Sequence, residues 1–233
     1  MQLFYDNTII KGTTSHTLNE EESKHACKVM RLKEGDSIKL LNGKGIEFTA
    51  KIINAHPKHC EVCIIEEIIE EISNKEIHIA IAPTKMMDRL EWFLEKATEI
   101  GITEISLIHC DNSERKIIKE ERLEKILISA MKQSKRLFLP KLNSLIPFKT
   151  FISKYPNGLI AHCEEREKAT ITNSFKFKNS PILIGPEGDF SSDEIQVAFN
   201  ANYKPITLGR NRLRTETAAL FAVTEAQLLL NTL

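Results

Sequence analysis

The sequence has no net charge and no long apolar run. Its 233 residues contain 32 basic and 32 acidic side chains, so an anionic partner such as a nucleic acid would have to be met by a local patch. No apolar run reaches the roughly 18 residues that a membrane-spanning helix needs. The first residues also lack a basic segment followed by an apolar one. We therefore expect a soluble, cytoplasmic protein with no membrane partner.

Cysteines are few and scattered: Cys27, Cys60, Cys63, Cys110 and Cys163. An odd number in a chain of this length indicates a reducing compartment rather than a disulfide framework. Cys60 and Cys63 have the spacing of metal ligands, and His56 and His59 could complete a zinc site. However, the segment is typical of a strand, where residues three apart point to opposite faces. No second pair follows at a suitable distance, so we expect no metal.

The chain contains no internal repeat and no low-complexity tract, and its pattern changes near residue 73. Before that point we expect one helix, at 19–30, with Asn19 and Glu22 at the spacing of a capping box. Asn42-Gly43 predicts a tight turn between two strands. The predicted strands are 3–5, 37–41, 46–54 and 60–72. Residues 1–72 are therefore predicted to form a small β-barrel with one helix.

After residue 73, strands alternate with helices, which is typical of a mostly parallel sheet with crossover connections. The predicted strands are 77–82, 105–109, 158–161, 181–184 and 205–208. The predicted helices are 85–100, 120–134 and 215–230. Gly101 ends the first of these helices, and Trp92 within it is predicted to pack in the core. We expect an α/β domain spanning residues 73–233.

Two glycine-containing loops each connect a predicted strand to a helix. The first is Gly185-Pro186-Glu187-Gly188, followed by Ser191 and Glu194 at capping-box spacing. The second runs from Leu208 to Ala218. Glycine lets the backbone approach a ligand closely, and a ligand is expected at the carboxyl edge of the sheet. Either loop alone is better explained as a capped turn, but the pair indicates a ligand site.

Phosphate is the obvious alternative ligand. Neither G-x-x-x-x-G-K-[ST] nor G-x-G-x-x-G follows a strand, and Glu187, Asp189 and Glu216 would repel phosphates in the absence of a metal. The carboxylates therefore favour a neutral or cationic ligand.

Together the two loops resemble the paired signature of the RsmE family, ribosomal RNA uridine-N3 methyltransferases of the SPOUT class. The resemblance extends over essentially the whole chain and includes His25–Asp36, Lys96–Gly101, Ser113–Arg115 and Lys132–Ser134. One segment departs from the family pattern. Members often carry Gly-x-Arg-Ile-Leu-Arg in the second loop, whereas this chain has Gly209-Arg210-Asn211-Arg212-Leu213-Arg214. The departure leaves open which arginine faces the RNA.

The resemblance implies a PUA-like RNA-binding β-barrel followed by an α/β SPOUT domain with a C-terminal trefoil knot that binds S-adenosyl-L-methionine. It also implies a homodimer. Ala218, Ala222 and Ala226 recur every fourth residue in the last helix and suit either a dimer contact or packing inside one subunit. The implied cofactor-binding residues are Ile184, Gly185, Pro186, Glu187, Gly188, Leu208, Gly209, Leu213, Thr215, Thr217 and Ala218.

Uracil N3 carries a proton and is a poor nucleophile until that proton is lost. Arg214 is our candidate for stabilising the developing uracil anion, because its charge is permanent and its loop adjoins the cofactor. Glu216 or Glu187 would accept the proton, although Glu216 could instead only cap the helix or hold Arg214.

RNA contacts are placed by the resemblance and by basic clusters near two helix ends. The predicted residues are His25, Lys28, Arg31, Lys33, Arg115, Lys132, Gln133 and Arg136. His109, His162 and Cys163 sit near predicted strand ends, where they either line the cofactor pocket or pack.

The resemblance therefore predicts methylation of N3 of a specific uridine in 16S (small-subunit) ribosomal RNA, in an assembled or late-stage 30S subunit. One alternative is a SPOUT enzyme that acts on a different RNA nucleoside or a ribose hydroxyl. Another is a non-catalytic RNA-binding protein of ribosome assembly.

Overall fold

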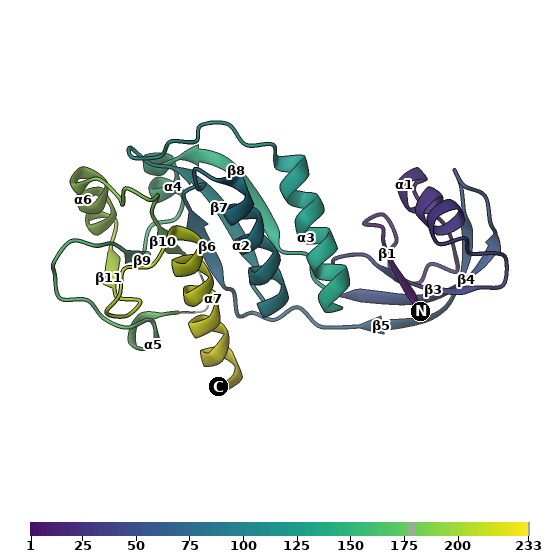
Figure 1. Cartoon of the computed structure of the whole chain (residues 1–233). Coiled ribbons are helices and arrows are strands. Elements are labelled where there is room, and N and C mark those ends of the chain that lie inside the picture. Colours follow the sequence, from purple (N-terminus) through teal and green to yellow (C-terminus); the bar gives the residue numbers. More distant parts are fainter. Residues whose placement is uncertain (177, 179, 233) are drawn as a thin grey trace. The chain divides into compact units, whose positions relative to one another are not determined.

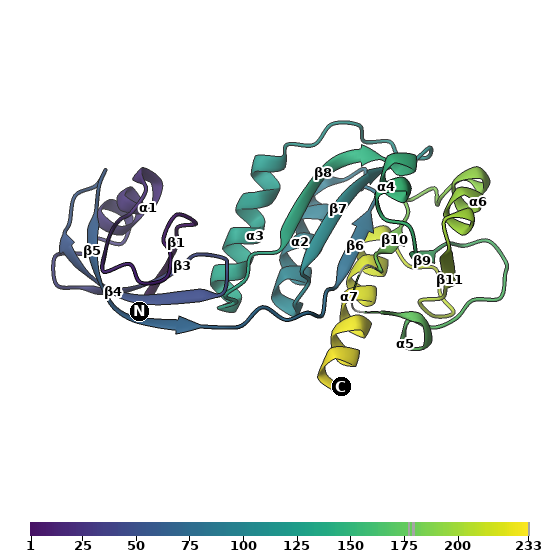
Figure 2. The same cartoon turned by 180° about the vertical axis from the view of Figure 1, so that it is seen from behind.

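A computed structural model describes residues 1–176, 178 and 180–232, so the expected domain end at Leu233 lies outside it. The described residues form two compact units (Figures 1 and 2). Unit 1 contains Met1–Ile72 together with Met131–Leu139, and unit 2 contains Ser73–Ala130 and the chain from Pro140 onward.

Unit 1 is built on a five-stranded sheet in the order β1-β3-β4-β5-β2. Its strands are β1 (Gln2–Tyr5), β2 (Ser15–Thr17), β3 (Ser37–Leu41), β4 (Ile46–Asn54) and β5 (Glu61–Ile69). The turn predicted at Asn42-Gly43 joins the antiparallel pair β3 and β4, and Gly43 adopts a φ of 69°. The sequence missed β2, which has only three residues, and β5 ends at Ile69 rather than Ile72.

The predicted helix of unit 1 begins as α1 (Glu20–Lys24) and continues as a π-helix, η1 (His25–Val29). Asn19 caps it, because its side chain accepts the N–H of Glu22 at 2.9 Å. The reciprocal half of the predicted capping box is wrong. The carboxylate of Glu22 instead accepts the Tyr5 N–H at 3.0 Å and the Lys132 ammonium at 2.9 Å. Glu22 is therefore bonded to residues distant in sequence rather than to the backbone N–H of Asn19.

Residues 131–139 belong to unit 1 although they follow a segment of unit 2. Gly45 donates its N–H to the Leu137 carbonyl at 3.0 Å, and Leu139 donates to the Gly43 carbonyl at 2.9 Å. This pairing places Lys132 against Glu22. No local sequence pattern predicts it, because the partners are some ninety residues apart.

Unit 2 contains a six-stranded, entirely parallel sheet in the order β11-β9-β10-β6-β7-β8. Its strands are β6 (His78–Ile81), β7 (Glu104–His109), β8 (Lys141–Pro147), β9 (Gly158–Ala161), β10 (Ile182–Ile184) and β11 (Tyr203–Ile206). The sequence missed β8, and β11 begins two residues earlier than predicted. The chain runs outward from β6 to β8, and its later strands return to the other side of β6. Such a reversal of strand order is where α/β sheets bind ligands.

Helices cover both faces of this sheet (Figures 1 and 2). They are α2 (Met87–Ile100), α3 (Glu120–Ser134), α4 (Phe148–Lys154), α5 (Ile171–Ser174), α6 (Ser192–Asn200) and α7 (Thr215–Thr232). α7 packs against α2, β6 and β10, while α4 and α6 share a core with the opposite side chains of the strands. The capping box predicted at Ser191 and Glu194 is confirmed at the start of α6. The sequence missed α4 and α5.

The alanine stripe of α7 packs inside its own subunit, because Ala222 and Ala226 are fully buried. Phe221 and Leu228 of the same helix remain exposed, at 41% and 60%. The prediction that Trp92 packs in the core is wrong, since this side chain of α2 is 43% exposed.

Within the described chain, no helix combines the length and apolarity needed to cross a bilayer.

A buried polar network lies among β6, β7 and β8. His78 Nε2 is 2.8 Å from the Ser106 hydroxyl, and Asn143 donates to that hydroxyl at 2.9 Å and to Glu104 at 2.6 Å. Burial lowers the pKa of His78 to about 4 from its ordinary 6.5, although the Glu104 charge opposes the shift. The imidazole is therefore neutral near pH 7, and its bond to Ser106 satisfies a polar atom inside the sheet.

The buried, neutral His78 should make the stability of the folded protein depend on pH. Between pH 6.5 and 4 the unfolded state binds the proton and the folded state does not, so the free energy of unfolding falls as pH decreases. The full contribution is about 3 kcal/mol. Urea denaturation of the His78→Gln variant should show a flatter pH dependence than the unchanged protein. His59→Gln, at an exposed position, should leave the slope as it was, and equal slopes in all three proteins would contradict the prediction.

Candidate functional site

Three neighbouring parallel strands, β11, β9 and β10, end at the same edge of the sheet. The segments that follow them line one cavity of about 570 Å³, a size suited to a small organic ligand. Its lining comprises Ala161–Cys163, Lys168, Ile184–Glu187, Asp189, Ile206–Thr215 and Ala218. The two glycine loops therefore meet at the carboxyl edge of the sheet, as the sequence predicts.

The first loop is held by its own carboxylates. Asp189 accepts the N–H of Cys163 at 2.7 Å and of Phe190 at 2.9 Å, and Glu187 accepts the N–H of Lys85 at 3.0 Å. The sequence interpretation treated these acidic groups as selectors of ligand charge. In the structure they first satisfy backbone donors of the surrounding segments.

The second loop is tied to the first by Thr215, the first residue of α7. Its buried hydroxyl donates to the Gly185 carbonyl at 3.1 Å. Gly209 has a φ of 117°, which favours glycine, and an added Cβ would meet no heavy atom within 4 Å. The loop backbone therefore borders open space beside the cavity.

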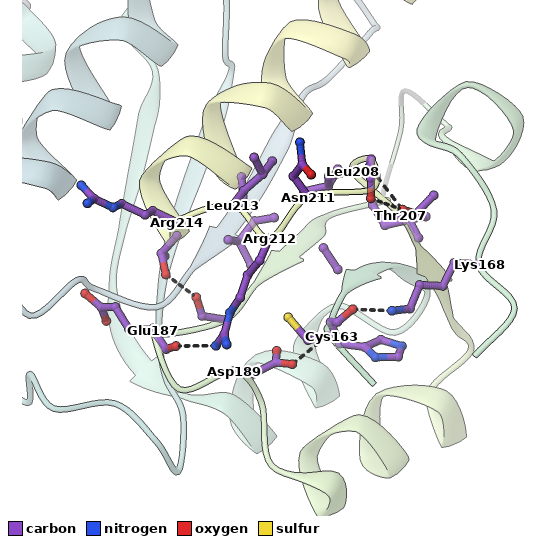
Figure 3. A pocket seen from close by; sticks show the side chains of 18 of the residues that line it. Cys163, Lys168, Glu187, Asp189, Thr207, Leu208, Asn211, Arg212, Leu213 and Arg214 are labelled. Atoms are coloured by element: carbon purple, nitrogen blue, oxygen red, sulfur yellow. Dashed lines mark hydrogen bonds between the residues drawn. The ribbon is translucent and has the colours of Figure 1, made fainter. Parts of the chain in front are cut away.

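Arg212 provides a second connection between the loops. Its Nη2 donates to the Glu187 carbonyl at 3.3 Å, and Figure 3 shows the side chain extending from one loop toward the other. Arg214 also lines the cavity, but in the same view it extends away from Cys163 and Asp189.

His162 and Cys163 line the cavity, whereas His109 does not, which decides the alternative left open by the sequence. Burial lowers the pKa of His162, whose ring nitrogens have no hydrogen-bond partner in the described structure. Burial and the Asp189 charge raise the pKa of Cys163. Lys168, which the sequence analysis did not select, donates to the His162 carbonyl at 2.6 Å. The end of β11 was a sequence signal for Ile206 and Thr207, which also line the cavity, whereas Lys168 lies at neither strand end.

Most predicted cofactor-binding residues come together at the cavity. Those in its lining are Ile184, Gly185, Pro186, Glu187, Leu208, Gly209, Leu213, Thr215 and Ala218. Gly188 and Thr217 are not in the lining, and the Gly188 carbonyl accepts the side-chain N–H of Asn112 at 3.3 Å. Glu216 is buried next to the lining, with one oxygen 3.9 Å from Nε of Arg89 and the other without a hydrogen-bond partner among the described atoms.

Seven of the eight predicted RNA-binding residues lie in unit 1. Four of them are exposed: Lys28, Arg31, Lys33 and Gln133. His25 Nδ1 instead lies 3.3 Å from the Glu22 carboxylate, and Lys132 forms an ion pair with the same carboxylate at 2.9 Å. Burial lowers the pKa of Arg136. Arg115, in unit 2, donates to the carbonyls of Thr84 and Lys85 and so holds the segment before α2.

In the part of the chain that the structure describes, no cluster of His, Cys, Asp and Glu could hold a metal ion. Cys60 is buried and Cys63 exposed, as the alternation of a strand predicts. His56 and His59 stack on each other with ring centroids 3.6 Å apart.

Thr215→Val should destabilise unit 2, because it removes the donor to a buried carbonyl with little change of volume. We expect a loss of about 1–3 kcal/mol in the free energy of unfolding. Thr217→Val, an exposed site in the same helical turn, should cost much less. Urea denaturation of both variants tests this, and equal losses would show that the bond to Gly185 contributes little.

Comparisons with known proteins agree with this geometry. The RNA methyltransferase domain family matches residues 71–227, and the RNA methyltransferase PUA domain family matches residues 18–65. The Ribosomal RNA small subunit methyltransferase E of Rickettsia conorii is 32% identical over 232 residues, covering 97% of this chain and 94% of the relative.

Solved structures extend the similarity to three dimensions. A probable rRNA-methyltransferase from Porphyromonas gingivalis is 40% identical, with a TM-score of 0.89 and coverage of 100% and 99% of the two chains. The Ribosomal RNA small subunit methyltransferase E of Neisseria gonorrhoeae, solved with S-adenosyl methionine, is 28% identical, with a TM-score of 0.84 and 98% coverage of each chain. With two matched domains, a cavity between two glycine loops and relatives along its whole length, the chain belongs to the RsmE family of ribosomal RNA small subunit methyltransferases.

Proposed function

We propose that this protein transfers a methyl group from S-adenosyl-L-methionine to N3 of a specific uridine in small-subunit ribosomal RNA. The observation that carries the proposal is the cavity formed where the two glycine loops meet, joined by the Thr215 bond to Gly185. The name and bound ligand of the Neisseria relative support both the cofactor and the RNA substrate. The specificity for uridine N3 follows from the family resemblance.

The cavity residues fit this cofactor. Aliphatic side chains of Ile184, Ile206 and Leu208 would provide apolar contacts for the adenosine part of the cofactor, and the open space beside Gly209 would let the loop backbone approach the ligand. When bound, the cofactor supplies the activated methyl group on a sulfonium. The enclosing loops would align that group with the uracil nitrogen and limit access of water.

We propose that Arg214 and Glu216 are the catalytic residues. Arg214 stabilises the uracil anion that develops as N3 loses its proton, since a guanidinium remains charged throughout. Glu216 accepts the proton. It lies in the first turn of α7, directly after Thr215, and one of its oxygens has no hydrogen-bond partner in the described part of the chain.

We further propose that residues 1–72 form a PUA-like RNA-binding barrel and that residues 73–233 form a SPOUT domain with a trefoil knot at its C-terminal end. The five-stranded sheet of unit 1 supports the first assignment. Placement of the exposed Lys28, Arg31 and Lys33 in unit 1 supports RNA contact there.

The proposed assembly is a homodimer that acts on an assembled or late-stage 30S subunit in the cytoplasm. The exposed Phe221 and Leu228 of α7 support a dimer contact, because apolar side chains on one helix face are costly to leave in water.

The function predicts one missing modification in cells that lack the protein. Mass spectrometry of their small-subunit ribosomal RNA should show the loss of a single N3-methyluridine, restored by re-expression of the gene. Loss of a ribose methylation or of another methylated base would instead identify a different target. Unchanged RNA would favour a non-catalytic role.

Arg214→Ala should reduce turnover much more than cofactor affinity. Removing a group that stabilises developing charge costs about 10²-fold or more in kcat. Calorimetry with S-adenosyl-L-methionine should meanwhile give a dissociation constant close to that of the unchanged protein. Comparable losses in both quantities would make Arg214 a structural residue of the loop.

A further inference from the structure

The charged side chains that line the cavity are mostly basic. Three exposed arginines of the second loop line it: Arg210, Arg212 and Arg214. The carboxylates in the lining are bonded to backbone N–H groups, and Lys168 is bonded to a backbone carbonyl. The carboxylates are thus bonded to the backbone and Lys168 to the segment that follows β9, so an anionic part of a ligand would be attracted to the arginines.

Arg212 differs from the other two because its side chain is held across the site. Its bond to the Glu187 carbonyl, at 3.3 Å, is slightly longer than ordinary N–H···O bonds. A neutral acceptor at this distance is readily exchanged for a charged one, which forms shorter and stronger bonds. The other N–H groups of the guanidinium remain available to a ligand.

The positive charge of Arg212 also acts on a cavity residue outside its own loop. Burial and Asp189 raise the pKa of Cys163, and the Arg212 charge opposes that shift. Cys163 follows β9, so the field of Arg212 reaches a segment other than its own loop. Figure 3 shows the side chain directed into the region shared with Glu187 and Asp189.

We propose that Arg212 binds the α-carboxylate of S-adenosyl-L-methionine. This carboxylate is the one anionic group of the cofactor, and the planar guanidinium can bind it through two parallel hydrogen bonds. The inference rests on the proposed function and adds a specific role to an arginine that departs from the usual family pattern of the second loop. In this arrangement Arg214 serves the base and Arg212 the cofactor.

Decarboxylated S-adenosylmethionine separates this role from others, because it lacks the carboxylate and retains the sulfonium, the amine and the adenosine. Calorimetry should show that Arg212→Gln weakens binding of the complete cofactor by about 10- to 100-fold, since a bond to a charged group is lost. Binding of the decarboxylated ligand should be unchanged. Arg212→Lys should give an intermediate loss, because its point charge cannot bind in two places.

Lys204→Gln is the matched control, because it removes one exposed positive charge from β11 outside the cavity lining. It should bind both ligands as the unchanged protein does. Equal weakening of both ligands by Arg212→Gln would mean that Arg212 only shapes the loop, and would overturn the proposal. Normal cofactor affinity with reduced affinity for ribosomal RNA would also overturn it and place Arg212 on the RNA side. If the unchanged protein binds neither ligand, the proposed function itself fails.

Discussion

The parallel pairing of β11, β9 and β10 is the constraint on which the candidate site depends. Because parallel neighbours end at the same edge of a sheet, segments widely separated in sequence leave the sheet side by side. The bond from Thr215 to Gly185 then fixes the beginning of α7 against the first loop. Without the strand pairing, neither the cavity nor this contact would exist.

The charged side chains around the cavity of unit 2 have two separate roles. Asp189 and Glu187 stabilise the loops by accepting backbone N–H groups, and this explains acidic residues beside a site whose available charge is positive. The arginines keep donors free for ligands. This division follows from the requirement that backbone groups inside a protein find partners before a binding site can be rigid.

In unit 1, Glu22 likewise stabilises several segments at once. This buried carboxylate accepts the Tyr5 N–H, contacts the His25 ring and forms an ion pair with Lys132, so it connects β1, the first helix and the segment 131–139. A buried carboxylate is tolerated when it is paired and hydrogen-bonded in this way. Two residues expected to touch RNA therefore also stabilise the unit that would bind it.

Sequence alone determined the family, and it predicted a division near residue 73 and the two loops of the site, because glycines, caps and strand alternation act over a few residues. It predicted the cap of α6 at Ser191, but misplaced Trp92 and missed β8. Tertiary structure alone decided that Glu22 bonds to Lys132, that His162 lines the cavity and that Arg212 crosses it. Those outcomes depend on contacts between distant segments, whose energies exceed local preferences and which no short pattern records.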